Sequence, residues 1–331
     1  MRTAVVTGGA GFIGSHMVDL LLNEGFEVRV IDNLVTGRLE NVAHHQGNPR
    51  LVFHRADICD LPDGSSLFDR AELVFHFGGI GDIVPSIERP LDYMRANVNG
   101  TLAVLEESRR AGVKKFVYAA SSSCYGLASV PTPEDAPIRP EYPYALSKYL
   151  GELAALHWGQ VYQFPVVSIR MFNVYGPRVR TTGVYGAVFG VFLAQKANGK
   201  PFTVVGDGTQ RRDFVYVTDV ARAFLMAAES PFTGEAFNLG AGDPQSVNRL
   251  VELIGGPVAY VPKRPGEPDC TWADIGKISR YLGWKPVVTF EEGVAAMLQQ
   301  LDQWRSAPLW TPESVEAATQ TWFQYLSNRT A

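Results

Sequence analysis

The sequence predicts an α/β fold in which a doubly wound parallel sheet is joined to a smaller mixed α/β C-terminal domain. Over the first two thirds of the chain, short runs of β-branched and aromatic residues alternate with longer helical patterns. A glycine-rich turn directly follows the first of these runs. After about Tyr175 the sequence changes to loops rich in Gly, Pro and Arg, mixed with short strands and helices.

The elements of the first domain are expected in alternating order. The strands are predicted at Thr3–Thr7, Glu27–Ile31, Leu51–Arg55, Leu73–Phe77, Lys115–Ala119 and Val166–Ile169, and the helices near Ile13–Glu24, Asn97–Ala111 and Ala145–Tyr162. The last two helices carry apolar residues three and four positions apart, so they could also form a dimer face. We expect one domain at residues 1–175 and a second at 176–331, with some chain crossing between them.

Composition excludes several classes of protein. The 331 residues are 46% hydrophobic and carry a net charge of -4, with scattered cations, so no nucleic-acid partner is expected. The three cysteines are far apart and have no nearby histidine pairs, which argues against disulfides and a metal site and favours the cytoplasm. The N-terminus has no signal-peptide pattern and the longest apolar run is too short to span a bilayer, so no membrane anchor is expected.

The segment TGGAGFIG at residues 7–14 predicts a phosphate-binding turn of the Rossmann type. Gly8, Gly11 and Gly14 stand between the first strand and the first helix, where close backbone approach and free helical N–H groups suit a pyrophosphate. Asp32 and Asn33 end the second strand, where a carboxylate can accept hydrogen bonds from a ribose diol and repels a 2'-phosphate. We therefore expect NAD rather than NADP, although glycines alone would also suit any tight turn.

Asp57 follows the third strand and could either reach the adenine or cap its own loop. The full set of residues expected at the cofactor is Gly8, Gly11, Phe12, Ile13, Gly14, Asp32, Asn33, Asp57, Ile58, Phe77, Gly78, Asn97, Tyr144 and Lys148.

Tyr144 and Lys148 are four residues apart at the start of a predicted helix, so both side chains project from one face. A nearby ammonium and a cationic nicotinamide would lower the tyrosine pKa from about 10 and make the phenol a base near neutral pH. The same spacing also arises by chance on a solvated helix face.

Taken together, the motifs resemble the extended short-chain dehydrogenases/reductases of the NAD-dependent epimerase/dehydratase family, and especially the UDP-hexose 4-epimerases. Besides the glycine turn and Tyr144 with Lys148, the resemblance rests on DNLVTG (32–37), NVNGT (97–101), SSSCYG (121–126), FNVYGPR (172–178), RDFVYVTDVA (212–221), FNLGAG (237–242), RPGEP (264–268) and WAD (272–274). It covers nearly the whole chain. It implies a tightly bound NAD, a nucleotide-diphosphate sugar as substrate, UDP being favoured, and a homodimer.

The resemblance also implies a catalytic group of three residues. Tyr144 would take the proton of a sugar hydroxyl while hydride passes from the same carbon to NAD, and Ser121 would hydrogen-bond the reacting oxygen. Lys148 would bind the nicotinamide ribose and lower the tyrosine pKa. The 4-keto intermediate would then rotate in the pocket and take the hydride back on its other face. From the residues alone, Ser121 could equally be a serine that stabilises a turn.

On the substrate side, the resemblance assigns Asn173, Arg212 and Arg264 to the diphosphate and Glu267 to the nucleotide ribose. Without it, these arginines would be read as surface ion-pair residues. Thr271 falls where related epimerases admit or refuse a substituent at sugar position 2. Two further clues conflict. Arg180 lies where uronate epimerases place an arginine near the sugar carboxylate, whereas Asn173 matches the pattern of epimerases that act on neutral hexoses.

The reaction type depends on Ser122 and Ser123, which we also expect at the substrate. Dehydratases of the family carry Asp and Glu at these positions, and decarboxylases generally retain the glutamate, whereas serines cannot act as strong acids or bases at neutral pH. Epimerisation is therefore favoured. The alternatives are a 4,6-dehydratase, a decarboxylase, a 3,5- or 2-epimerase, and a non-catalytic NAD-binding sensor. The usual His-x-Ala-Ala segment reads His76–Gly79 here, followed by Ile80, Gly81 and Asp82, which predicts a flexible loop beside the cofactor.

Overall fold

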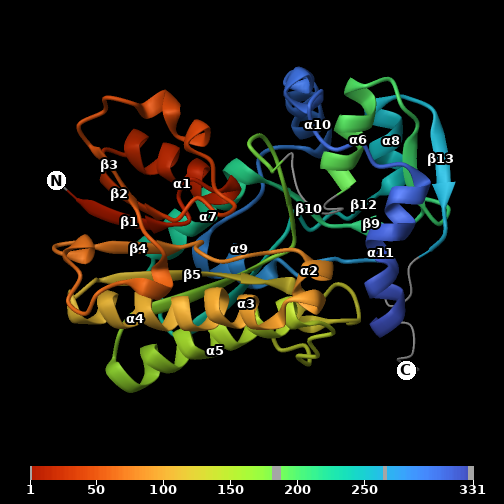
Figure 1. The fold of residues 1–331 in the computed structure, drawn as a ribbon. Helices are drawn as coiled ribbons and strands as arrows, with labels where there is room; N and C mark the ends of the chain where they lie inside the picture. Colours follow the sequence, from red (N-terminus) through yellow and green to blue (C-terminus); the bar gives the residue numbers. More distant parts are fainter. Residues whose placement is uncertain (1, 181–187, 264–266, 327–331) are drawn as a thin grey trace.

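The computed structural model describes residues 2–180, 188–263 and 267–326. Its centre is a seven-stranded parallel sheet in the order β11-β6-β5-β4-β1-β2-β3 (Figure 1). The strands are β1 (Thr3–Thr7), β2 (Glu27–Asp32), β3 (Leu51–Arg55), β4 (Leu73–His76), β5 (Lys115–Ser121), β6 (Val166–Met171) and β11 (Glu235–Leu239). The chain order reverses between β1 and β4, which is where sheets of this kind bind ligands, beyond the carboxyl ends of the strands.

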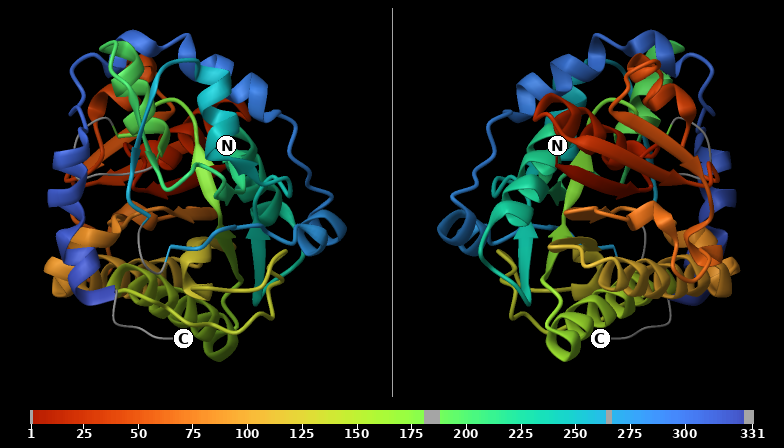
Figure 2. Two further views of the ribbon diagram at one scale, coloured as in Figure 1. Left: turned by 90° about the vertical axis from the view of Figure 1, so that its right-hand side faces the viewer. Right: turned by 90° about the vertical axis from the view of Figure 1, so that its left-hand side faces the viewer.

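Helices cover both faces of the sheet, which explains why its central strands read as continuous apolar runs. Helices α1 (Phe12–Asn23) and α7 (Val217–Glu229) pack against one another on one face. Helices α4 (Gly100–Arg110) and α5 (Pro143–Tyr162) lie side by side on the other face, as the views of Figure 2 show. The α/β fold with a doubly wound sheet is confirmed.

The six strands predicted for the first domain are all present, with ends that differ by at most two residues. Helix α4 begins at Gly100 rather than Asn97, because residues Arg95–Asn99 form a π-helical turn, η5. The seventh strand, β11, was not predicted. It pairs with β6 although it comes from the second half of the chain.

The second half also forms a smaller mixed unit with its own apolar core. Its elements are β7 (Asn173–Tyr175), α6 (Val188–Ala197), β8 (Phe202–Val205), β9 (Arg211–Arg212), β10 (Phe214–Tyr216), β12 (Gln245–Ser246), α8 (Val247–Ile254), β13 (Val258–Val261) and α10 (Phe290–Leu298). Helix α9 (Gly276–Leu282) packs instead against β11 and α7 of the main sheet, and α11 (Pro312–Leu326) packs against the helix Ile83–Glu88. The two-stranded pairings are β7 with β10, β9 with β12 and β8 with β13. The domain boundary after residue 175 stays a prediction.

Shorter helices complete the described chain. They are η1 (Leu39–Asn41), η2 (Ala43–His45), η3 (Ile58–Asp60), η4 (Ser66–Phe68), α2 (Ile83–Glu88), α3 (Pro90–Met94), η6 (Ser122–Tyr125) and η7 (Leu301–Trp304). Among the described residues, no helix is both long enough and apolar enough to cross a bilayer.

Candidate active site

The glycine turn between β1 and α1 has a backbone conformation and close backbone contacts that residues with a β-carbon would prevent. Gly8 has a φ of +68°, and a β-carbon on it would lie 2.8 Å from the backbone nitrogen of Gly78. A β-carbon on Gly14 would lie 2.2 Å from the carbonyl oxygen of Gly8. The N-cap of α1 is Gly11, and no side chain caps the helix, so its first N–H groups are available to a ligand. The turn therefore fits a pyrophosphate.

Asp32 lies at the end of β2 and holds this turn in place. Its Oδ2 accepts a hydrogen bond from the backbone N–H of Ala10 (3.0 Å), and its Oδ1 accepts one from Leu34 (2.8 Å). Burial raises the pKa of the carboxyl group, and the two N–H donors oppose that rise. Each oxygen retains a lone pair, so the carboxylate can still accept hydrogen bonds from a ribose diol. A β-carbon on Gly37 would lie 2.7 Å from these oxygens, so the glycine leaves room beside them.

Asp57 serves as a loop cap, which was one of its two expected roles. Its Oδ1 accepts a hydrogen bond from the backbone N–H of Cys59 (2.9 Å) and caps η3. Its Oδ2 accepts one from Asn33 (3.1 Å), so the two predicted residues stand together beyond β2 and β3. Next to them, Ile58 is buried.

The loop after β4 is held by Asn97, which lies in the π-helical turn η5. The Asn97 Oδ1 accepts a hydrogen bond from the backbone N–H of Ile80 (2.8 Å), and its Nδ2 donates to the Ile80 carbonyl (3.0 Å) and to Ser147 (2.9 Å). At the start of the loop, the backbone N–H of Gly78 donates to the Thr7 hydroxyl (3.1 Å), and Phe77 packs against Phe224. Asn97 thus positions the backbone beside the predicted cofactor residues.

The structure brings the three predicted catalytic residues together. Ser121 ends β5, while Tyr144 and Lys148 stand one turn apart at the start of α5. The Ser121 hydroxyl lies close enough to the Tyr144 phenol to lower its pKa, and the Ser121 Oγ lies 2.8 Å from the Ser123 Oγ. The ring of Tyr142 is parallel to that of Tyr144 at 6.4 Å between centroids. The serine is therefore placed to align the reactive phenol.

The expected lowering of the Tyr144 pKa by Lys148 and a cationic nicotinamide stays a prediction. Burial raises the pKa of Tyr144, with the hydrogen bond from Ser121 opposing the rise and the charge of Asp82 adding to it. Burial also lowers the pKa of Lys148 to about 8, against the attraction of Glu152. The ammonium nitrogen lies 4.6 Å from the centre of the Tyr118 ring. The protein side chains alone therefore favour the neutral phenol, because the desolvation of both groups disfavours their charged forms.

A buried ion pair lies one turn beyond Lys148. Glu152 accepts hydrogen bonds from Arg170 at 2.6 and 2.9 Å on one carboxylate oxygen and at 3.1 Å on the other. Arg170 also donates to the Tyr125 hydroxyl (2.7 Å) and to the Glu134 carbonyl (2.9 Å). This network joins α5 to β6 directly below the catalytic residues. The sequence analysis gave it no role.

Replacing Glu152 by glutamine should lower the free energy of unfolding by about 3–5 kcal/mol, because it leaves the buried Arg170 charge uncompensated. Urea denaturation at neutral pH measures the change. As a matched control, Glu252→Gln removes the carboxylate of an exposed pair with Arg249 and should cost less than about 1 kcal/mol. Equal small losses in both variants would contradict the role of the buried pair.

Four predicted substrate residues meet near the ends of β7 and β9. The Thr271 hydroxyl donates to the Asn173 side chain (2.9 Å), and the Thr271 backbone N–H donates to the Arg211 carbonyl (3.1 Å). Arg212 donates to Glu267 (2.7 Å) and to the Pro268 carbonyl (2.8 Å). The residues assigned to the diphosphate and to the ribose are thus neighbours. Arg264 lies outside the described residues.

Arg180 pairs with Asp82, which was not among the predicted site residues. Asp82 has a φ of +80°, a backbone conformation that is uncommon for non-glycine residues, and it ends the Gly78–Asp82 loop. Its charge acts on Tyr144 and on Tyr93, whose ring stands edge-on to that of Tyr144 at 6.3 Å. The only sequence signal for this arrangement was the unusual composition of the loop.

The comparison with known proteins identifies the family. The model of the NAD dependent epimerase/dehydratase family matches residues 4–240. The chain belongs to this family. It is thus an NAD-dependent enzyme, and the resemblance expected from the motifs is confirmed.

Individual relatives span almost the whole chain. The UDP-glucose 4-epimerase of Mycolicibacterium smegmatis is 35% identical over 90% of this chain and 98% of its own length. The crystal structure of UDP-glucose 4-epimerase from Thermotoga maritima with UDP-glucose matches with a TM-score of 0.84 at 35% identity, covering 91% of this chain and 99% of the other. The Bacillus cereus UDP-glucuronic acid 4-epimerase, in complex with UDP-glucuronic acid and NAD, matches with a TM-score of 0.85 at 32% identity and the same coverage.

Proposed function

We propose that this family member is a UDP-hexose 4-epimerase that works through a 4-keto sugar. The observation that carries the proposal is the placement of the Ser121 hydroxyl beside the Tyr144 phenol, next to which Ser122 and Ser123 offer no acid or base for loss of water. The phenol and the serine hydroxyl suffice to move one proton at a sugar hydroxyl. Dehydration or decarboxylation would need further groups for the later steps.

The described residues supply the proton and orientation steps. The glycine turn and Asp32 would hold NAD, which when bound would supply reversible hydride transfer at the sugar carbon. Tyr144 takes the hydroxyl proton and later gives it back, and Ser121 holds the reacting oxygen in line with the phenol. Lys148 places a positive charge one helical turn of α5 away from Tyr144, and this charge stabilises the transient phenolate. No proton is consumed overall, because the same tyrosine completes both halves of the reaction.

The remaining predicted residues are proposed to hold the nucleotide. Arg212 and Asn173 would donate to the diphosphate, and Glu267 would accept hydrogen bonds from the ribose after exchanging its contact with Arg212. Thr271, already bonded to Asn173, would lie near sugar position 2 and leave room for an acetamido group. Accordingly we propose residues 1–175 as the main cofactor domain and 176–331 as the substrate domain, with α7 and β11 completing the sheet.

Proton NMR of the purified enzyme with added NAD tests the function. The substrates are UDP-glucose, UDP-N-acetylglucosamine, UDP-glucuronate and the dTDP, CDP and GDP hexoses. We expect the 4-epimer of a UDP-hexose to appear, with no loss of water or carbon dioxide. A 4-keto-6-deoxy sugar, a pentose product, or no product from any of these substrates would overturn the proposal.

The ion pair between Asp82 and Arg180 favours a neutral sugar. Both side chains are about one third exposed, at 30% and 32%, and Asp82 lies close enough to Tyr144 for its charge to act on the phenol. Asp82 neutralises the charge of Arg180. To reach Arg180, the carboxylate of a sugar would have to displace the Asp82 carboxylate, whose negative charge would also repel it. The ion pair therefore supports the neutral-hexose pattern of Asn173 over the uronate pattern of Arg180.

Replacing Asp82 by asparagine should raise the ratio of kcat/KM for UDP-glucuronate to that for UDP-glucose roughly tenfold, about 1.4 kcal/mol. The charge of Arg180 then becomes available to the sugar carboxylate. Coupled assays with both substrates measure the ratio. The double variant Asp82→Asn, Arg180→Gln should lose the gain. An unchanged ratio in the single variant would show that the pair does not select the sugar.

We also propose a homodimer formed through α5, packed beside α4. Apolar side chains on α5 face outward, at 40% exposure for Leu146, 44% for Leu153 and 52% for Val161. A reducing compartment, the cytoplasm, would suit the three cysteines, which are all unpaired.

Light scattering after size exclusion should therefore show a dimer, and Leu153→Lys should convert it to a monomer, because a buried charge at the interface is costly. Leu91→Lys, at an apolar residue of α3 that is 79% exposed, is the control and should leave the dimer intact. A monomeric wild-type protein would refute the α5 interface.

A further inference from the structure

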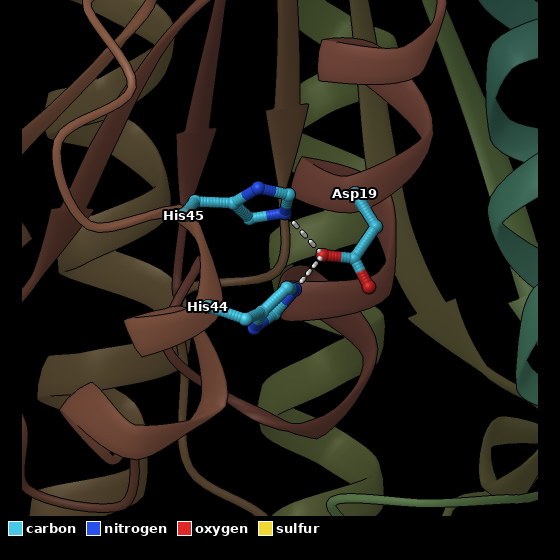
Figure 3. Close-up of side chains that lie close together, drawn as sticks. All are labelled: Asp19, His44 and His45. Atoms are coloured by element: carbon cyan, nitrogen blue, oxygen red, sulfur yellow. Dashed lines mark hydrogen bonds and ion pairs between the residues drawn. The ribbon is translucent and has the colours of Figure 1, made fainter.

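Two adjacent histidines converge on one carboxylate away from the catalytic residues. His44 and His45 lie on η2, in the connection between β2 and β3, and Asp19 lies on α1. The Nε2 atoms of His44 and His45 lie 2.8 and 2.7 Å from the same Asp19 oxygen, Oδ1. Figure 3 shows the two rings next to one another, with both Nε2 atoms directed at that oxygen. Their centroids are 4.0 Å apart.

Both contacts have hydrogen-bond lengths, and the atoms that converge are also the donor atoms of a metal-ligand set. One nitrogen from each ring and one carboxylate oxygen all lie within 4.8 Å of one another. A single hydrogen bond from one imidazole would suffice to hold Asp19, yet neighbouring residues both turn their Nε2 atoms to one point. Imidazole nitrogen and carboxylate oxygen together are ligands that Zn²⁺ prefers.

We propose that Asp19, His44 and His45 bind one Zn²⁺ ion through Oδ1 and the two Nε2 atoms, with water as the fourth ligand. Tetrahedral ligands at about 2.0–2.1 Å from zinc are roughly 3.3 Å apart, so each histidine has to move outward by only about half an ångström. Each Nε2 must be free of its proton to bind, and in a neutral ring that proton passes to Nδ1. The His44 side chain is 44% exposed, which leaves a path for the ion and the water.

The surrounding residues support the carboxylate without filling the ligand position. The Arg178 guanidinium forms an ion pair with the other Asp19 oxygen, with Nη1 2.7 Å from Oδ2. Ligating carboxylates are commonly supported in this way by an outer residue. The arginine also lies 3.4 Å from the His44 Nε2, a contact that has to open when zinc binds. His16 stays outside the set, because its Nε2 is hydrogen-bonded to the Pro177 carbonyl (3.0 Å).

The proposed ion would join parts of the chain that are far apart in sequence. It ties η2 to α1, the helix whose first turn forms the phosphate site. It would therefore stabilise the folded protein by mass action, since the unfolded chain does not hold the three ligands together. None of its ligands contacts Tyr144, Ser121 or Lys148 in the structure, so the site is separate from the proposed chemistry. The expectation from the cysteine spacing had been that the chain has no metal site.

Titration calorimetry of the tag-free enzyme, with NAD present, against ZnCl₂ tests the proposal. We expect one ion per chain, and a rise of a few degrees in the melting temperature at saturating zinc. His44→Gln and His45→Gln should each weaken zinc binding at least about tenfold. The control His157→Gln removes an exposed histidine of α5 and should bind zinc like the wild type.

A second measurement does not depend on the variants. Anomalous diffraction at the zinc edge, from wild-type crystals soaked in ZnCl₂, should place the ion between Asp19, His44 and His45. Absence of binding, or binding that both glutamine variants retain, would overturn the proposal. So would an ion located elsewhere in the crystal, such as at the cysteines. Turnover of the sugar is not used as the readout, so failure of the proposed epimerase function would not affect the result.

Discussion

Tyr144→Phe should lower kcat by roughly a thousandfold while leaving NAD bound. The substitution removes only the phenolic oxygen, which lies beside Ser121 and would take the sugar proton. The ring remains, so its packing against Tyr142 and Tyr93 should hold the local structure. We would measure kcat and KM by the NMR assay and NAD content by release on denaturation. The fall should appear in kcat more than in KM, because the lost contact acts in the transition state.

Tyr142→Phe is the matched control, since it removes a hydroxyl from the parallel neighbouring ring. That hydroxyl lies beside Ser123, so the loss should be less than about tenfold. If Tyr144→Phe retained a tenth or more of wild-type turnover, or if both variants lost activity equally, the tyrosine would not be the proton carrier. The conclusion about the fold would be unaffected.

Gly14→Ala should abolish NAD binding and lower the free energy of unfolding by several kcal/mol. The new β-carbon would lie 2.2 Å from the Gly8 carbonyl oxygen and 2.8 Å from its carbonyl carbon, both of which are backbone atoms. Neither can move without opening the turn that presents the α1 N–H groups, so steric strain and loss of the phosphate site occur together. NAD titration and thermal unfolding measure the two effects.

Gly190→Ala provides the comparison for a helical glycine. There the β-carbon would first meet the edge of the Trp304 ring at 3.3 Å, so a small shift of that side chain accommodates it. Alanine also favours a helix over glycine by up to about 1 kcal/mol, so the net change should be small. Normal NAD binding in Gly14→Ala would show that the turn tolerates a side chain and would contradict its proposed role.

Local features of the fold and the site were readable from the amino-acid sequence. Six strands, the turn with Gly8 and Gly14, and the pairing of Tyr144 with Lys148 on one helix face all depend on residues close together in the chain. Side-chain periodicity and the conformational freedom of glycine act over a few residues, which makes such features predictable. The motifs placed the chain in its family for the same reason.

Long-range pairings and charge states were decided by the tertiary structure. Strand β11 joins β6 across more than sixty residues of intervening chain, and no local pattern marks it as part of the first sheet. The pairs of Asp82 with Arg180 and of Glu152 with Arg170, and the convergence of two histidines on Asp19, likewise unite distant segments. Burial, which depends on everything packed around the phenol, raises the Tyr144 pKa, and the four-residue spacing of Tyr144 and Lys148 could not predict that effect.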